Sequence, residues 1–156
     1  MLEVSVRSLR ASDAAYVARI LRATNWFAHM AEETAEQTEL RIRHHVALCR
    51  IEGGHSGYVA ELPSGDVVGY VLVHWLPSLF LPRHEGYLSE LFVDEACRGK
   101  GIDRRLLDVV IREARDRNAS RLSLITNRNR ESYERAFYAK AGWVERDGLV
   151  CFALTL

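Results

Sequence analysis

The sequence predicts a single α/β domain over residues 1–156, in which a mixed, mostly antiparallel, twisted sheet of about seven strands is flanked by about four helices. Two observations point to this class. Short runs in which apolar and polar residues alternate, as strands require, recur along the whole chain. Between them lie stretches whose apolar residues return at the spacing of a helix packed on a sheet. No repeat or linker-like segment interrupts this order, which favours one domain.

The chain is expected to begin with a strand and two helices. Residues 4–9 alternate apolar and polar side chains and predict the strand. Ser12 has the character of an N-cap, and the amphipathic pattern after it predicts a helix that ends near Arg22. Residues 31–48 are rich in Glu, Gln and Arg and predict a second helix, after an irregular aromatic segment over residues 25–30.

A β-hairpin and a fourth strand are predicted in the middle of the chain. Residues 57–62 and 67–75 are apolar, β-branched runs, and the turn residues Pro63-Ser64-Gly65-Asp66 join them. A loop over residues 76–85 ends the hairpin, and residues 86–93 then form the next strand.

The second half is predicted to alternate helices and strands. From Gly101 the apolar period changes from two to near 3.6, which predicts a helix of about four turns. The remaining elements are a strand over residues 121–126, a helix over 132–140, and closing strands over 143–146 and 149–154 around the hairpin dipeptide Asp147-Gly148.

The composition excludes several classes of function. The 21 lysines and arginines are matched by 21 aspartates and glutamates, so no strong net charge attracts nucleic acid or anionic lipid. No apolar run approaches the ~20 residues that span a bilayer, and residues 1–10 lack the apolar stretch of a signal peptide. We therefore expect a cytoplasmic protein without nucleic-acid or membrane partners. The 3 cysteines lack metal-ligand spacing, so no disulfide framework or metal site is expected.

The most informative stretch is a basic turn at residues 98–101, called the glycine turn below. A predicted strand precedes it and a helix follows at once, so backbone N–H groups and the positive end of the helix dipole meet there. Gly99 and Gly101 permit close approach of a ligand, and Arg98 and Lys100 add charge suited to a phosphate. A plain tight turn is the alternative. The turn lacks the Gly-Lys-Ser/Thr of a P-loop and the third glycine of the dinucleotide fingerprint.

Residues 91–107 resemble the acetyl-CoA signature of the GNAT superfamily of N-acetyltransferases, Arg/Gln-x-x-Gly-x-Gly/Ala. Arg98 and Gly101 match this pattern, whereas Asp103 stands where the family has glycine or alanine. Residues 137–143, Phe-Tyr-Ala-Lys-Ala-Gly-Trp, resemble the family's later Phe-Tyr-x-Lys-x-Gly-Phe segment. The order of predicted strands and helices also fits, so the resemblance spans nearly the entire chain.

This resemblance implies a GNAT-like acyl-CoA N-acyltransferase fold and transfer of an acetyl group from acetyl-CoA, the cosubstrate, to a primary amine by direct attack in a ternary complex. In that family the donor lies between the fourth and fifth strands and places its diphosphate on the turn. The residues implied to contact acetyl-CoA are Leu91, Phe92, Val93, Arg98, Gly99, Lys100, Gly101, Ile102, Asp103, Arg104 and Asn129. For the polar loop that holds Asn129, capping of the last helix is an equal explanation.

Tyr138 occupies the tyrosine position of the family and is the implied general acid for the leaving thiolate. A tyrosine phenol has an ordinary pKa near ~10 and stays protonated at neutral pH, as a general acid must. The alternative is that Tyr138, beside Phe137, is a packing residue of the last helix.

Glu90, on the strand before the glycine turn, is the candidate general base. Glu85 and His84 are alternatives, and a water relay is equally open. For either glutamate, a surface or structural role is the alternative to catalysis. Diamine acetyltransferases, which this stretch resembles, have a glutamate where this chain has Ser89. Strict alternation along the strand places Glu90 on the same face as Leu88 and Phe92, and Glu85 on the face of Tyr87 and Ser89.

The acceptor side is expected to use side chains from the loops around the amine site, with core packing as the alternative. These are Trp26, Phe27, Trp75, Leu79 and Phe80. The acceptor is expected to be a small-molecule or peptide amine, and a second copy of the chain is a candidate partner. Two rival functions stay open: a non-catalytic acyl-CoA-binding module of the same fold, and transfer that uses a longer acyl donor or an acceptor other than an amine.

Overall fold

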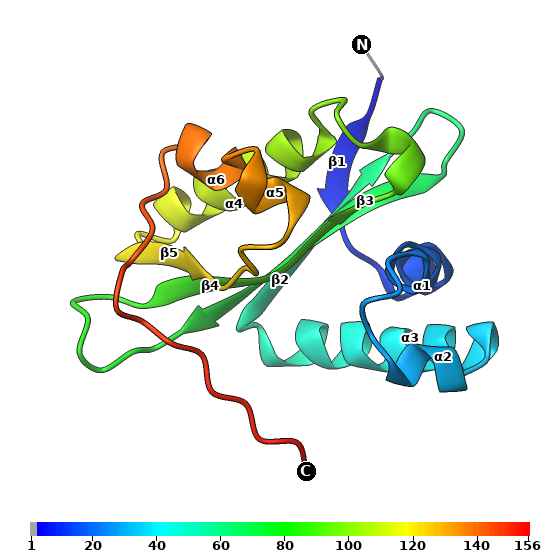
Figure 1. Cartoon of the computed structure of the whole chain (residues 1–156), viewed down its shortest axis with the longest axis horizontal. Coiled ribbons are helices and arrows are strands. Elements are labelled where there is room, and N and C mark those ends of the chain that lie inside the picture. The colour runs from blue at the N-terminus through cyan, green and yellow to red at the C-terminus, as the bar shows by residue number, and fades with distance from the viewer. Residues whose placement is uncertain (1–2) are drawn as a thin grey trace. The chain divides into compact units, whose positions relative to one another are not determined.

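The computed structural model describes residues 3–156 (Figure 1). In chain order its elements are β1 (Ser5–Ser8), α1 (Ala14–Ala23), α2 (His29–Glu32), α3 (Ala35–Glu52), β2 (His55–Glu61), β3 (Val67–Leu76), β4 (Glu85–Val93), α4 (Ile102–Asp116), β5 (Arg121–Leu124), α5 (Glu131–Glu134) and α6 (Phe137–Lys140), with short 3₁₀ helices at Ala11–Asp13 and Glu95–Cys97. Residues up to Ser123 form one compact unit and Leu124–Leu156 a second, so the expected single domain stays a prediction.

The sheet has the strand order β1-β2-β3-β4-β5. The first four strands pair antiparallel, and Tyr70 at the centre of β3 lies opposite Val59 of β2 and Phe92 of β4. β5 lies beside β4 and is reached through α4, the kind of connection that parallel neighbours require. The sheet is therefore mixed and mostly antiparallel, which confirms the predicted α/β class.

The hairpin of β2 and β3 forms where the sequence predicts it. Leu62 donates its backbone N–H to the Asp66 carbonyl, and Gly65 donates its own to the Leu62 carbonyl, both at 2.9 Å. Gly65 has a φ of 89°, which glycine adopts without strain. Turn chemistry thus sets the register that carries β3 through the middle of the sheet.

Helices cover both faces of the sheet in the first unit (Figure 1). α1 and α3 pack on the face that includes Val59, Tyr70 and Phe92, called the α1/α3 face. α4 packs on the opposite face, called the α4 face, where Ile102 and Leu106 are buried. Gly69 of β3 lies under α4, since a Cβ there would approach both of these side chains to 3.3 Å. Neighbouring strand residues point to opposite faces, so Tyr70 faces the other helices.

A polar network crosses the α4 face. The Glu113 carboxylate of α4 accepts hydrogen bonds from the Ser56 hydroxyl at 2.6 Å, the Tyr58 hydroxyl at 2.9 Å and Arg117 Nε at 2.8 Å. Ser56 in turn accepts the Nε1–H of Trp75 at 2.9 Å. Burial, together with the bond to Glu113, raises the pKa of Tyr58 to about 12. Each member has a partner inside the network, which therefore ties α4 to β2 and β3.

The start of α1 differs from the prediction. Ser12 does not cap the helix but lies inside the 3₁₀ turn Ala11–Asp13, and Asp13 precedes α1. The Asp13 carboxylate accepts the backbone N–H of Arg10 at 2.8 Å and pairs with Arg7 of β1 at 2.9 Å. The longer, charged side chain of Asp13 makes this connection between strand and helix, which a serine hydroxyl could not.

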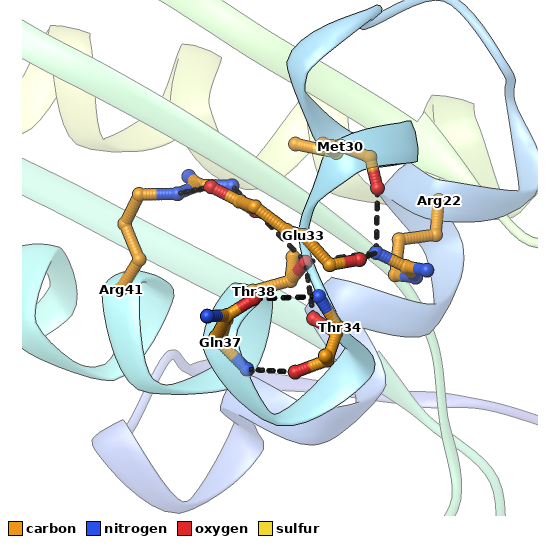
Figure 2. A network of polar contacts seen from close by, with 7 residues as sticks. All are labelled: Arg22, Met30, Glu33, Thr34, Gln37, Thr38 and Arg41. Carbon is orange, nitrogen blue, oxygen red and sulfur yellow. Dashed lines mark hydrogen bonds and ion pairs between the residues drawn. The ribbon is translucent and has the colours of Figure 1, made fainter.

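Residues 31–48, predicted as one helix, belong to two. The break lies at Thr34, the N-cap of α3 (Figure 2). Gln37 donates its backbone N–H to the Thr34 hydroxyl at 3.1 Å, and Thr34 donates its own to the Gln37 side chain at 2.8 Å. This reciprocal capping box starts a new helix at Ala35 and separates it from α2.

The chain after Ser123 departs most from the predicted elements. The described residues form five strands and six α-helices, so the expected numbers of strands and helices are wrong. β5 ends at Leu124, and Ala136, with a φ of 54°, divides the predicted last helix into α5 and α6. The closing strands expected over 143–146 and 149–154 are absent from the described chain, where Phe152 is 91% exposed.

Side-chain contacts replace strand pairing in this second unit. The Glu145 carboxylate accepts hydrogen bonds from Arg128 Nη2 at 2.5 Å and from the Tyr133 hydroxyl at 2.9 Å. These bonds hold the segment after α6 against the residues around the start of α5. A strand requires backbone partners on a neighbouring strand, and an alternating sequence does not supply them. This is why the sequence pattern overestimates the number of strands.

Gly86 provides a test of the packing between β4 and β5. A Cβ at Gly86 would lie 2.5 Å from the Leu122 side chain and 2.6 Å from the Trp75 ring, whose indole is held by Ser56. We expect Gly86→Ala to lower the free energy of unfolding by about 1–3 kcal/mol, because the buried ring cannot move aside without strain. Urea denaturation measures the change.

Gly54→Ala is the matched control. A Cβ at Gly54 meets only the Trp75 carbonyl oxygen, at 3.9 Å, so its effect should stay within about 0.5 kcal/mol. Equal unfolding free energies for the two variants would show that β4 and β5 are not closely packed at Gly86.

Candidate functional site

The glycine turn lies between the end of β4 and the first residue of α4. Gly99 and Gly101 have φ angles of 71° and 77°, in the left-handed region that favours glycine. A Cβ at either position would have no atom within 4 Å, so the space beside the turn is open. Gly101 is the N-cap of α4, and the first-turn N–H groups of a helix have no intrahelical partner. The backbone here is therefore suited to bind an anion.

Two cations extend from the turn into solvent. Arg98 donates from Nε to the Val93 carbonyl at 3.3 Å, and Lys100 donates from Nζ to the Ala96 carbonyl at 2.9 Å. Both bonds are to neutral oxygens and both side chains are exposed, so an anion with two or more negative oxygens would compete well for these cations.

Asp103 places a negative charge in the first turn of α4. Its carboxylate accepts the backbone N–H of Arg104 at 2.9 Å. The adjacent Arg104 side chain pairs with Asp108 one turn later, at 2.8 Å. The Asp103 carboxylate thus occupies the Arg104 N–H. This is one of the N–H groups at the start of α4 that would otherwise face a bound anion.

Residues Leu91, Phe92 and Val93 pair with β3 along one edge of β4. Two contacts between β4 and β5 lie at the other end of β4: Glu85 pairs with Arg121, and Gly86 packs on Leu122. Both are away from the residues that lead into the glycine turn.

A β-bulge in β4 separates Glu90 from Leu88. Leu72 of β3 pairs with Glu90, but the next residue, Val73, pairs with Leu88, so Ser89 is the extra residue. Glu90 therefore shares a face with Phe92, as expected, but the expectation that it also shares a face with Leu88 is wrong. Strict alternation fails at the bulge, and Glu90 lies on the α1/α3 face with Tyr70.

Glu90 is held by a buried tyrosine. The Tyr70 hydroxyl donates to Oε2 of Glu90 at 2.5 Å, and Tyr70 is only 2% exposed. Burial, followed by the charge and the hydrogen bond of Glu90, raises the pKa of Tyr70 well above its ordinary value. Tyr70 therefore remains a hydrogen-bond donor over the physiological pH range and fixes the carboxylate at the sheet surface.

Further polar side chains follow Glu90 along the same face. Nε2 of His74 lies 2.7 Å from the Ser89 hydroxyl, and Nδ1 of His74 shares a hydrogen bond of 2.5 Å with Nδ1 of His55. Burial, and then the proximity of His55, lower the pKa of His74, which keeps this imidazole neutral near pH 7. The bulge thus brings a carboxylate, a hydroxyl and a neutral imidazole to one face.

Sequence reasoning did not single out Tyr70 or His74. The signal that could have found them is their position: both are polar, they lie four residues apart in an otherwise apolar strand, and even spacing puts them on one face.

An aromatic cluster adjoins Glu90. The Phe92 ring stacks on Tyr70 with centroids 5.8 Å apart, and it also contacts Trp26 at 5.8 Å and Phe27 at 6.2 Å. Trp26 and Phe27 come from the connection between α1 and α2, and Trp26 is 48% exposed. The structure therefore brings two of the predicted acceptor-side residues to the same surface as Glu90.

Other candidates are held elsewhere. Glu85 forms an ion pair of 2.5 Å with Arg121 at the start of β4, and the His84 ring contacts Trp75 edge-on. Trp75 lies on the α4 face, where its indole bonds Ser56. Leu79 and Phe80 are exposed in the loop after β3, and Phe80 packs under the Arg121 guanidinium. These contacts favour Glu90 over Glu85 and His84 as a proton acceptor.

Tyr138 and Asn129 belong to the second unit. The Tyr138 ring packs edge-on against Phe137 at 5.0 Å and Trp143 at 5.9 Å. Asn129 is exposed and donates its backbone N–H to the Asn127 side chain at 2.9 Å, a turn that precedes α5. Within this unit both residues therefore have local structural contacts.

Residues 3–156 contain no group of three or more His, Cys, Asp or Glu side chains arranged to hold a metal ion. Over the same residues, no helix is long and apolar enough to cross a membrane.

The sequence matches the profile of the acetyltransferase (GNAT) family over residues 19–143, which is most of the chain. A comparison with curated proteins found no match.

Several solved structures share this fold. Ribosomal-protein-alanine N-acetyltransferase from Brucella melitensis biovar Abortus 2308 is 21% identical, with a TM-score of 0.73 over 99% of this chain and 100% of that chain. A transcriptional regulator from Bacillus halodurans C-125 is 18% identical, with a TM-score of 0.82 over 99% and 100%. Glucosamine-6-phosphate N-acetyltransferase from Arabidopsis thaliana is 16% identical, with a TM-score of 0.77 over 98% and 99%. At these identities the likeness shows the fold.

Proposed function

The chain belongs to the acetyltransferase (GNAT) family, and on that premise we propose that it transfers the acetyl group of acetyl-CoA to a primary amine. The observation that carries this proposal is the course of β4. The strand presents Glu90 on the α1/α3 face and then leads directly, through Asp94 and a 3₁₀ turn, into the glycine turn. One strand thus connects a candidate proton acceptor with a candidate diphosphate site.

The glycine turn fits the diphosphate of coenzyme A. Acetyl-CoA supplies an activated acetyl group as a thioester. Arg98 and Lys100 would exchange their neutral carbonyl partners for phosphate oxygens, and the open backbone at Gly99 and Gly101 would donate N–H groups. The first turn of α4, with Ile102 and Arg104, would complete this part of the site, and Asn129 would contact the pantetheine or phosphate.

The edge of β4 at Leu91, Phe92 and Val93 would pair with the pantetheine arm as an added strand would. Its other edge is already paired with β3, and the known contacts of β5 lie at the far end of β4. This arrangement gives the donor a backbone partner next to the α1/α3 face.

The transfer requires protons to leave nitrogen and reach sulfur. An amine arrives as an ammonium ion, and Glu90 would accept the first proton so that the nitrogen lone pair can attack the thioester carbon. The C–N bond forms, the C–S bond breaks, and Tyr138 would protonate the departing sulfur. The second nitrogen proton restores the phenol, so the products are an amide, a thiol and one proton on Glu90.

Glu90→Gln is expected to lower kcat for acetyl transfer by about 10²–10⁴-fold, because glutamine cannot accept the amine proton. The pH–rate profile on its acidic side should change with it. Release of the coenzyme A thiol, measured with acetyl-CoA and a panel of primary amines, tests both statements.

Glu85→Gln is the control for this variant. It should keep kcat but lose about 1–3 kcal/mol of stability, because it breaks the ion pair with Arg121. If Glu90→Gln keeps its rate while His74→Gln loses it, the base is His74 instead.

Tyr138→Phe is expected to lower kcat by tens to hundreds of fold, about the lower range for a general acid, with unchanged affinity for acetyl-CoA. Stabilisation against heat by acetyl-CoA, about 2.7 kcal/mol at 100 times Kd, shows that binding is retained. Phe137→Leu, which alters the neighbouring ring without removing a proton donor, serves as the control. An unchanged kcat in Tyr138→Phe, with chemistry shown to be rate-limiting, would leave Tyr138 a packing residue.

Asp103→Gly is expected to tighten acetyl-CoA binding by a few fold to about tenfold, where ~1.4 kcal/mol is one decade. The substitution removes a charge that repels the diphosphate by an amount on the order of 1 kcal/mol, and it frees the Arg104 N–H. The gain should shrink at high salt, where charges are screened. Calorimetric titration of both proteins at two ionic strengths measures this, and equal or weaker binding by the glycine variant would contradict it.

A further inference from the structure

The strands beneath the aromatic cluster carry very little charge. β3 contains no acidic or basic residue other than His74, and β4 contains no lysine or arginine. Of the two glutamates in β4, Glu85 is paired with Arg121 at the start of the strand. Glu90 is therefore the one carboxylate that β3 and β4 offer to an acceptor on the α1/α3 face.

The nearby arginines of α1 and α3 are already engaged (Figure 2). Nη1 of Arg22 donates to the Met30 carbonyl at 2.7 Å, the Glu33 carbonyl at 2.9 Å and the Thr38 hydroxyl at 3.0 Å. Arg41 makes two bonds to the Glu33 carboxylate, at 2.9 and 2.7 Å. These bonds leave the two guanidinium groups poorly placed to hold a carboxylate or phosphate of an acceptor.

The same network engages the Glu33 carboxylate, which is therefore not available as a second anionic partner for an acceptor. Arg41, with a further contribution from Thr38, lowers the pKa of Glu33 to about 2, so its charge is matched by its arginine partner. Arg19 of α1 is likewise paired with Asp94, at 2.6 Å. Neither an additional ammonium group nor an additional anionic group of an acceptor would find a matching charge among these residues.

An apolar surface lies beside the single carboxylate. Trp26 is half exposed, contacts Phe92, and belongs to a ring cluster that reaches Glu90 through Tyr70. Aromatic faces bind apolar groups through buried area and attract a cation at their centres. A ligand with one ammonium group and an apolar body matches this arrangement, since the charge can meet Glu90 while the body covers Trp26.

We propose, on the premise of the function above, that the acceptor is a primary monoamine with an aromatic or otherwise apolar body and no other charged group. A second charge would lose water at this surface without gaining a partner, which is costly. The proposal therefore excludes polyamines, free amino acids and phosphorylated sugars as preferred acceptors.

Two matched pairs of amines test the proposal. Hexylamine and 1,6-diaminohexane differ by one ammonium group, and phenethylamine and phenylalanine differ by one carboxylate. We expect kcat/KM to be higher for the first member of each pair by about tenfold or more, as for a pocket that leaves a charged group unpaired. Titration calorimetry of the same amines into the protein with coenzyme A present should give the same order of affinity.

Substitution of Trp26 tests the surface itself. Trp26→Ala should raise KM for phenethylamine by about tenfold with little change in kcat, and Trp26→Phe should restore most of the loss. Ethylamine, which is too short to cover the ring, should respond little to either change. Leu40→Ala is the control, because this apolar side chain is also exposed on the surface but lies on α3 outside the ring cluster.

The outcomes separate the acceptor class from the proposed reaction. Faster transfer to 1,6-diaminohexane or phenylalanine would overturn the acceptor class while acetyl transfer stands. An equal effect of Trp26→Ala on ethylamine and phenethylamine would overturn the role of the ring. Failure to acetylate any amine, in protein that acetyl-CoA still stabilises against heat, would overturn the proposed function and this inference with it.

Discussion

The hydrogen bond from the Tyr70 hydroxyl to Glu90 determines how this carboxylate is presented on the α1/α3 face. Glu90 pairs with Leu72 and alternates regularly with Phe92, which pairs with Tyr70, so these side chains share that face. The extra residue Ser89 interrupts the alternation between Leu88 and Glu90, and Leu88 is buried on the α4 face. Ser89 itself reaches His74 from the bulge. The bulge therefore lets one strand present Glu90 to one face of the sheet and Leu88 to the other.

The two faces of the sheet use polar residues differently. On the α4 face, Glu113 is surrounded by its donors Ser56, Tyr58 and Arg117, so its charge contributes to the attachment of α4. On the α1/α3 face, Glu90 is partly exposed and Tyr70 supplies a fixed donor to one of its oxygens. A carboxylate can accept at both oxygens, so Glu90 is oriented without being fully enclosed. The first arrangement is structural, and the second leaves the group able to bind a ligand.

The elements that the sequence predicts well are those with local causes. The hairpin at Gly65 and the amphipathic α4 follow from turn chemistry and periodicity, and the glycine turn lies where strand and helix meet, as expected. The bulge at Ser89 and the closing strands depend on pairing between distant segments, which alternation within one segment cannot reveal. For the same reason Glu90 could be nominated from the sequence, whereas its hydrogen bond with Tyr70, twenty residues earlier, could not be predicted.

The connection between α1 and α2 is closed at both ends by its own hydrogen bonds. Thr24 closes its start by donating to the Leu21 carbonyl and accepting the Trp26 N–H, and Arg22 holds its end through the Met30 carbonyl (Figure 2). Substitutions between these anchors would change the rings that the proposed site offers to an acceptor, while leaving the backbone of β4 and the glycine turn as they are. Under the proposed function, acceptor preference would depend on this short segment, and binding of the acetyl donor on the glycine turn. Such a protein would acquire new substrates by drift in this segment, with each intermediate still able to bind its donor.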